Sequence, residues 1–396
     1  MNVSHLVAGD PDGATTRYLN VRDLLLKIVT ASAESDALVS ETFWPSGMLG
    51  VSDTSRERER EHEHGNEGEY ENGREPDLTI VDLARDPADI HDLLEAVAGT
   101  TTRGEYELTR DYRLPRFDGD SYTVFTLIDV NSDEVAALVR TERRITIVRP
   151  PSVLGVRWLT RIVRDVATRV AKAEGSLVLH SSAFVFDDGA YLVIGDSGAG
   201  KSTTAIALAR LLPASGWMGN DRMHLDRRDG NYRATACPLP LAINKGSLDV
   251  MGVTDFAAWS VRAGFPQPGS DWDRFHGEDK LKLSSREVNR YLGVRVVPNA
   301  TLAGVILPRI DRDADYFLEP ATREYAAEVI GRNCFSLDDN LFGEDWLQVP
   351  VRRHLAPPSL DSFLAHIAEL PVLRCSLGSS ADVAKLADDF RDAVRG

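Results

Sequence analysis

The stretch Gly195-Asp196-Ser197-Gly198-Ala199-Gly200-Lys201-Ser202 matches the phosphate-binding loop pattern G-x-x-x-x-G-K-[ST] at every position. The apolar run over residues 190–194 predicts a buried strand before it, and the Ala- and Leu-rich run over residues 203–212 predicts a helix after it. Glycines let successive backbone N–H groups point at phosphate oxygens, and the helix N-terminus adds partial positive charge. The sequence therefore predicts a phosphate site between a strand and a helix.

The chemistry of this motif predicts ATP and Mg²⁺ as cofactors. Lys201 would reach the β- and γ-phosphates, and the Ser202 hydroxyl would bind Mg²⁺. The predicted cofactor-binding residues are Gly195, Asp196, Ser197, Gly198, Ala199, Gly200, Lys201, Ser202 and Thr203. The alternative is a chance glycine-rich turn, which the matching strand and helix on either side disfavour.

Composition limits the classes of partner. The chain has 396 residues, enough for two or three domains, with 43% hydrophobic and 27% charged residues. A net charge of −16 argues against nucleic acid or an anionic membrane as the main partner. We expect no membrane span, because the chain has no apolar run long enough, and no signal peptide, because the first residues lack a basic region followed by an apolar core. Cys237, Cys334 and Cys375 match no metal-binding spacing, so we expect buried thiols in a reducing cytoplasm.

The pattern of the chain predicts an α/β fold (α+β overall) in several parts. We expect a loose leader over 1–20, and a small N-terminal α+β domain over 21–155 with a β-meander over 103–150. The domain that contains the loop would cover 156–310 and begin with an amphipathic helix over 156–173, and 311–396 would complete it.

Residues 53–76 are dense in charge and nearly free of large apolar side chains, which predicts a mobile insertion in the N-terminal domain. His62 and His64 within it raise the alternative of a metal site, but a solvated charged loop explains them with less.

Three residues around the loop are candidates for catalysis or metal binding. His180 lies on a predicted strand before the loop, and Asn220-Asp221 ends a predicted strand after it. Phosphoryl transfer needs positioning, charge neutralisation and a group that accepts the hydroxyl proton. Asp221 has the chemistry to bind metal or take that proton. The alternatives are a hydrogen-bonded core histidine for His180, a turn residue for Asn220, and a helix cap or surface acid for Asp221.

This order of elements resembles the catalytic domain of HPr kinase/phosphorylase, whose core is like that of phosphoenolpyruvate carboxykinase. It also resembles the HPr-kinase-like proteins encoded among the tailoring genes of bacterial peptide natural products, lasso peptides included. The specific motifs span residues 175–310: Leu179-His180-Ser181-Ser182, the loop, Asn220-Asp221, Pro238-Leu239-Pro240-Leu241, and the strand with Lys280 and Lys282. The resemblance implies a P-loop kinase domain beside the small N-terminal domain.

The resemblance also implies roles for individual residues. Asp221, Lys201 and His180 would be catalytic, with Asp221 as the general base, and Ser202, Asp221 and Asn220 would be the metal ligands. Asn220 stands where the family has an aspartate, which removes one carboxylate and weakens the case for two metals and for reverse phosphorylase chemistry. The family's acceptor-contacting loop is not recognisable, so the acceptor cannot be carried over.

Two lysines on the predicted strand before residue 284 are further candidates. Lys280 and Lys282 alternate along it, so both would lie on one face and either meet phosphate or face water. Cys237 is expected to be a buried filler rather than a nucleophile.

Two function classes follow from the residues. The first is a kinase that transfers the γ-phosphoryl group of ATP to a hydroxyl group of a peptide, protein or small molecule. The second is a nucleotide-binding regulator or scaffold with little turnover, which the amide at Asn220 fits. A transport or mechanical ATPase is disfavoured, because no apolar strand ending in Asp-Glu follows the loop. We expect ATP and the acceptor as partners, with no nucleic acid and no membrane; the family enzyme is an oligomer, so a homo-oligomer is compatible with the resemblance.

Overall fold

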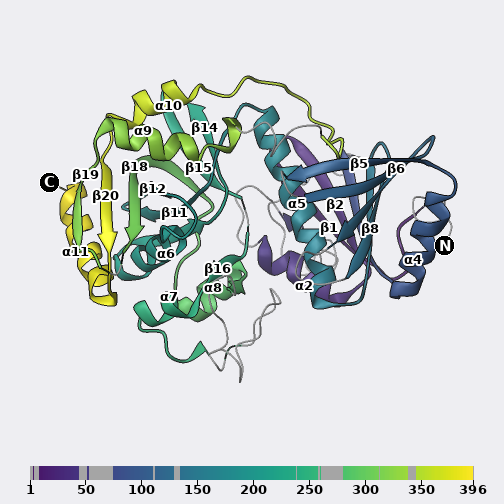
Figure 1. Ribbon diagram of the computed structural model, residues 1–396, viewed down its shortest axis with the longest axis horizontal. Helices are drawn as coiled ribbons and strands as arrows, with labels where there is room; N and C mark the ends of the chain where they lie inside the picture. The colour runs from purple at the N-terminus through teal and green to yellow at the C-terminus, as the bar shows by residue number, and fades with distance from the viewer. Residues whose placement is uncertain are drawn as a thin grey trace, which may run out of the picture. The chain divides into compact units, whose positions relative to one another are not determined.

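The structure is a computed structural model with an α/β fold (Figure 1), as the sequence predicts. It describes residues 3, 9–43, 51–52, 75–109, 112–128, 134–237, 239–256, 259, 280–311, 313–337 and 345–395. The chain forms two compact units. Unit 1 comprises Met1–Ser40, Leu49–Val170 and Asn340–Arg353. Unit 2 comprises Glu41–Met48, Ala171–Asp339 and His354–Gly396.

Unit 1 contains a mixed sheet. In spatial order its strands are β3 (Val51–Ser52), β1 (Thr15–Val21), β2 (Leu24–Thr30), β4 (Leu78–Ala84), β9 (Arg144–Arg149), β8 (Val135–Arg140), β7 (Thr123–Ile128), β6 (Tyr112–Asp118) and β5 (Thr102–Thr109). β4 pairs in parallel with β2 and with β9, and the other neighbours are antiparallel. The predicted β-meander is confirmed, because β5 to β9 follow one another in space.

The N-terminal region differs from the prediction. Residues Thr15–Val21 form β1, so the expectation of a loose leader over 1–20 is wrong over this stretch. β1 pairs along its whole length with β2, and the side chains of Leu19 and Val21 are fully buried. The predicted charged insertion falls almost entirely on residues 53–74, which lie outside the described residues, as do His62 and His64.

Helices cover the sheet of unit 1. They are α2 (Ala33–Thr42), α4 (Pro87–Ala98) and α5 (Val153–Ala173). α4 begins at a proline, which fits the first helical position because its missing N–H has no intrahelical partner there. Its apolar residues recur at helical spacing and pack on the sheet through Ile90, Leu93 and Val97. Most of α5 belongs to unit 1, so this unit extends to Val170 rather than ending at residue 155.

A segment from the C-terminal part of the chain completes the core of unit 1. Trp346 is buried, stacks on Tyr106 with ring centroids 5.7 Å apart, and meets the Phe125 ring edge-on at 5.1 Å. Its indole Nε1 donates a hydrogen bond to Asp165 Oδ2 at 2.9 Å, and its carbonyl accepts one from Arg140 Nη1 at 2.5 Å. The expectation that all of 311–396 completes the loop-containing domain is therefore wrong for this segment.

Unit 2 contains a second mixed sheet. Its strands are β10 (Leu177–Leu179), β14 (Met223–Arg228), β15 (Asn231–Ala236), β18 (Asn299–Ile310), β12 (Gly189–Ile194), β11 (Ser181–Phe186) and β13 (Ser215–Gly219), in that order. β18 runs parallel to β12 and to β20 (Val372–Leu377), which also pairs with β19 (Phe317–Pro320). A separate two-stranded sheet joins β16 (Leu241–Ile243) to β17 (Leu281–Leu283).

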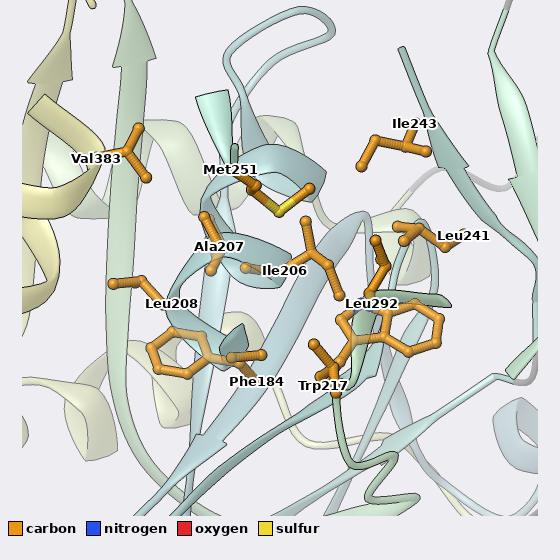
Figure 2. Close-up of a cluster of buried hydrophobic side chains, with 14 of the residues drawn as sticks. Phe184, Ile206, Ala207, Leu208, Trp217, Leu241, Ile243, Met251, Leu292 and Val383 are labelled. Carbon is orange, nitrogen blue, oxygen red and sulfur yellow. The ribbon is translucent and has the colours of Figure 1, made fainter. Parts of the chain in front are cut away.

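Alternate side chains of these strands enter cores on opposite faces, as the twofold period of a strand requires. The helices of unit 2 are α6 (Lys201–Leu211), α7 (Lys245–Val250), α8 (Ser285–Leu292), α9 (Arg323–Arg332), η3 (Phe335–Leu337), α10 (Leu360–Ile367) and α11 (Ser380–Arg395). Phe184 and Trp217 belong to the same core cluster as Ile206 of α6 and Val383 of α11 (Figure 2). On the other face, Val185 of β11 joins a core to which α9 and α10 contribute. Unit 2 is thus a sheet between two helical layers.

Among the described helices, none combines the length and the apolar character needed to cross a membrane.

We predict that Trp346→Ala lowers the free energy of unfolding of unit 1 by about 3–5 kcal/mol, because a large buried aromatic side chain leaves a cavity. Urea denaturation, monitored through hydrogen exchange of the backbone amides in β5 and β7, measures this change in the free energy of unfolding. Trp346→Phe keeps an aromatic ring at the site and should retain most of the stability. An unchanged denaturation midpoint for Trp346→Ala would contradict this account of the segment.

Candidate phosphate-binding site

The loop after β12 has the backbone that the motif requires. β12 ends at Ile194 and α6 begins at Lys201. Gly198 and Gly200 have φ of 81° and 92°, in the left-handed region that side chains other than glycine rarely adopt. A Cβ atom on Gly200 would also lie 2.6 Å from Ile310 Cδ1. The predicted sequence of strand, glycine loop and helix is therefore confirmed.

Lys201 is held inside the loop. Its side chain is 9% exposed, and Nζ donates hydrogen bonds to the carbonyl oxygens of Gly195 at 2.7 Å and Asp196 at 3.0 Å. Burial lowers the pKa of the ammonium group, the charges of Asp221 and Asp196 oppose this shift, and Lys280 adds to it. Both of these hydrogen-bond partners are neutral carbonyl oxygens, which the ammonium group could exchange for the oxygens of an anion.

The direction of three strands brings the other candidate residues to the loop. β11 is antiparallel to β12, with Ser181 opposite Ile194, and antiparallel to β13, with Ala183 opposite Gly219. The start of β11 therefore lies at the end of the sheet where β12 and β13 stop. This end, across which the strands begin and finish, is the sheet edge on which the candidate residues lie. His180 precedes β11, and Asn220-Asp221 follows β13. The structure thus brings His180, the loop and Asn220-Asp221 to one edge.

His180 and Asp221 face each other. His180 Nε2 lies 3.4 Å from Asp221 Oδ1, and the side chains are 27% and 46% exposed. The imidazole stacks on Phe335, with ring centroids 5.2 Å apart and an interplanar angle of 12°. The backbone N–H of His180 donates a hydrogen bond to the backbone carbonyl of Asn333 at 2.8 Å. His180 is partly exposed and lies beside a carboxylate, which disfavours the alternative of a hydrogen-bonded core histidine.

The first residues of α6 point in two directions. The Ser202 hydroxyl lies 3.3 Å from the hydroxyl of Ser182 on β11, within the sheet edge described above. The Thr203 hydroxyl lies 2.6 Å from that of Ser247, which in turn donates to Asn244 Oδ1 at 2.7 Å. Ser202 is thus the hydroxyl beside the sheet edge, whereas Thr203 connects α6 to the start of α7.

Asn220 offers an unused oxygen at this edge. The residue is 6% exposed, and its Oδ1 atom is buried without a hydrogen-bond partner in the part of the chain that the structure describes. A buried acceptor left unpaired costs about 1–3 kcal/mol, which a ligand cation or donor would offset. Asp221 next to it has φ of 72°, a left-handed conformation that aspartate and asparagine tolerate better than most residues.

These oxygens fit a magnesium ion that is bound together with a nucleotide. The described residues contain no group of three His, Cys, Asp or Glu side chains able to hold a metal ion. Mg²⁺ seldom uses an all-protein cage, because it keeps several waters and is held by one or two carboxylates and substrate phosphates. The Ser202 hydroxyl, the Asp221 carboxylate and Asn220 Oδ1 are oxygens of the kind that such a partial set would use.

Residues far along the chain contact this site, and the sequence analysis missed them. Arg332 Nη2 donates to Asp196 Oδ2 at 3.2 Å, and Asn333 Nδ2 donates to Asp196 Oδ1 at 3.4 Å. Phe335 belongs to the same segment and stacks on His180. No motif marks these residues; only the pairing of their segment with the strand before His180 brings them to the site.

The two lysine candidates differ in position. Lys280 lies before β17, and its charge acts on that of Lys201. Lys282 lies within β17 opposite Ala242, between the buried side chains of Leu281 and Leu283. Pro238 of the quoted motif lies outside the described residues, and the three cysteines are buried free thiols, as expected.

Comparisons with known proteins show no family at the level of sequence. No protein-family model matches the sequence, and no curated protein matches it. A solved structure described as the Hpr(Ser) kinase/phosphatase from Coxiella burnetii aligns with a TM-score of 0.25 and 11% identity, over 55% of this chain and 99% of that chain. At this identity and TM-score the likeness does not indicate a shared activity.

We predict that Asp221→Ala is less stable than Asp221→Asn and Asp221→Gly by about 1 kcal/mol, because alanine tolerates the left-handed backbone poorly. Thermal denaturation of the three variants measures the difference. Equal midpoints would show that the backbone at this position is not constrained. Asp221→Asn is therefore the variant that removes the charge with the least change in backbone.

Proposed function

We propose that this protein is an ATP-dependent kinase that transfers the γ-phosphoryl group to a hydroxyl group. The observation that carries the proposal is the meeting, at one sheet edge, of Lys201 in its glycine loop and the His180–Asp221 pair. Phosphoryl transfer needs a cationic phosphate cradle and a group that takes the hydroxyl proton. Both kinds of group are present here.

The loop would bind and orient the polyphosphate. Its backbone N–H groups and the start of α6 offer donors and partial positive charge. Lys201 would exchange the carbonyl oxygens of Gly195 and Asp196 for phosphate oxygens, which recovers the free energy that burial of its charge costs. Ser202, Asp221 and Asn220 would hold Mg²⁺, which supplies neutralisation of the phosphate charge when bound.

Asp221 would act on the acceptor. Its carboxylate would take the proton of the acceptor hydroxyl while that oxygen attacks the γ-phosphorus, and ADP would leave with the electrons of the broken bond. His180 Nε2, fixed by the stacked ring of Phe335, would hold the carboxylate in place. An aspartate can serve both the metal and the proton, since it has two oxygens.

For the acceptor, we propose the serine or threonine hydroxyl of a peptide or protein, with the precursor of a peptide natural product as one such substrate and a small-molecule hydroxyl as the alternative. We also propose a cytoplasmic location, because the buried cysteines are free thiols.

A second candidate function is a nucleotide-binding regulator with little turnover. The amide of Asn220 favours it, because an amide oxygen brings no negative charge to a metal ion. In such a protein Lys201 would serve binding, and the charge of Asp221 would be dispensable.

We predict that Lys201→Ala weakens ATP binding and lowers phosphoryl transfer by about 10²–10³-fold, since the cation that neutralises the phosphates is gone. Labelled ATP with Mg²⁺ and serine-bearing peptides encoded next to this gene provides the transfer assay, and calorimetry the binding assay. Lys385→Ala removes an exposed lysine of α11, paired with Asp389, and serves as the matched control with unchanged values. Full binding by Lys201→Ala would refute the proposed site.

We predict that Asp221→Asn keeps ATP affinity within about threefold and lowers transfer by about 10²–10⁴-fold, because it removes the proton acceptor. The same two assays separate the effects. Transfer at the parent rate would refute Asp221 as the base. Absence of transfer in both proteins, with ATP still bound, would favour the regulator.

We predict that ATP affinity falls in the alkaline range. Burial holds the pKa of Lys201 below its ordinary value in the free protein, and contact with phosphate would raise it. At a pH between these two pKa values, Lys201 would take up a proton when ATP binds. The affinity for ATP therefore decreases as the pH rises through that range. Calorimetry from about pH 8 to about pH 10 measures the decrease. Lys201→Arg, which stays charged, should lose it; a flat profile for the parent would contradict the shift.

A further inference from the structure

The loop contains a negative charge where a polyphosphate would bind. Asp196 is the second residue of the loop, and its side chain is 62% exposed. The negative charge of Asp196 acts on the Lys201 ammonium group, where it opposes the lowering of the pKa of that group by burial. A carboxylate near the binding place of a polyanion reduces affinity through charge repulsion unless another group neutralises it.

Each oxygen of this carboxylate has a donor from the end of α9. Arg332 Nη2 reaches Oδ2 at 3.2 Å, and Asn333 Nδ2 reaches Oδ1 at 3.4 Å. Arg332 Nη1 also donates to Glu328 Oε1, one turn earlier on α9, at 2.6 Å, and Asn333 Nδ2 donates to the carbonyl of Val329 at 2.9 Å. Both donors are therefore oriented by their own helix before they meet Asp196.

Stability alone does not account for this arrangement. Arg332 is 50% exposed, and ion pairs at this level of exposure contribute between zero and about 1 kcal/mol to folding. The same charge would also act on a polyanionic ligand bound at the loop, because it would interact with each negative charge of that ligand. The arginine can thus act on ligand affinity while contributing little to the stability of the fold.

We infer that Arg332 is a positioning residue for the loop: it neutralises Asp196, directs its carboxylate toward α9 and away from the phosphates, and so sets the affinity for a nucleoside triphosphate. This inference rests on the proposed nucleotide site. The mechanism requires Arg332 to act through Asp196, so the loss caused by removing Arg332 must disappear when Asp196 is also neutral.

A double-mutant cycle tests this dependence. The affinity for Mg·ATP is measured by calorimetry for the parent, Arg332→Gln, Asp196→Asn and the double variant. We expect Arg332→Gln to weaken binding about three- to tenfold, Asp196→Asn to bind at least as tightly as the parent, and the double variant to match Asp196→Asn within about twofold. The deficit of Arg332→Gln should shrink at high salt, which a merely structural role would not produce.

Two further variants serve as controls. Arg332→Lys keeps the charge and should bind within about twofold of the parent. Arg391→Gln removes the same charge from α11, where Arg391 pairs with Asp388, and should leave affinity unchanged. A similar loss from Arg391→Gln would attribute the effect to net charge and overturn the inference.

The outcomes separate this inference from the proposed function. A double variant as weak as Arg332→Gln would show that Arg332 acts on the ligand directly or on the fold, and would overturn the inference alone. Unchanged affinity for Arg332→Gln would do the same. No binding of ATP by the parent protein would overturn the proposed function together with this inference.

Discussion

The candidate site depends on one constraint of strand direction. β11 runs antiparallel between β12 and β13, so that the start of one strand and the ends of two others meet at a single edge. Had β11 run in the opposite direction, His180 would lie at the far edge of the sheet from the loop. The buried side chains of these strands alternate between the cores on either face, and this alternation holds their register, because a slip by one residue would exchange the two faces.

The electrostatics of the site contrast with those of the chain. The protein carries a net charge of −16, yet Lys201, Lys280 and Arg332 bring positive charge to or near the loop. The loop also includes Asp196, and Asp221 lies at the same edge, so the site is of mixed charge rather than uniformly basic.

Local features of the sequence predicted the local part of the site. The loop is a contiguous stretch, and its glycines and lysine form a motif that can be recognised within eight positions. The strand, the loop and the helix could therefore be predicted from the sequence alone. The order of His180, the loop and Asp221 was also predicted, and the structure brings them together. Whether Asp221 serves as a base or a metal ligand is a prediction that geometry alone does not test.

Residues whose role depends on distant pairing were missed. Arg332 lies 136 residues from Asp196 in the chain, and Trp346 finds its aromatic partners in strands of another part of the sequence. Neither has a neighbouring pattern that marks it. β1 was missed for a related reason: Leu19 and Val21 are its only fully buried side chains, and its extended form depends on pairing with β2.

The return of residues Asn340–Arg353 to unit 1 limits how such a protein can change by recombination. Each unit draws its chain from three separate stretches, so no single breakpoint divides the gene into two complete folding units. If recombination replaced only the amino-terminal part of the chain, the incoming sequence would have to provide a new packing site for Trp346. That site would need aromatic side chains in place of Tyr106 and Phe125. We therefore expect the lineage of this architecture to diversify by substitutions and loop insertions rather than by domain shuffling.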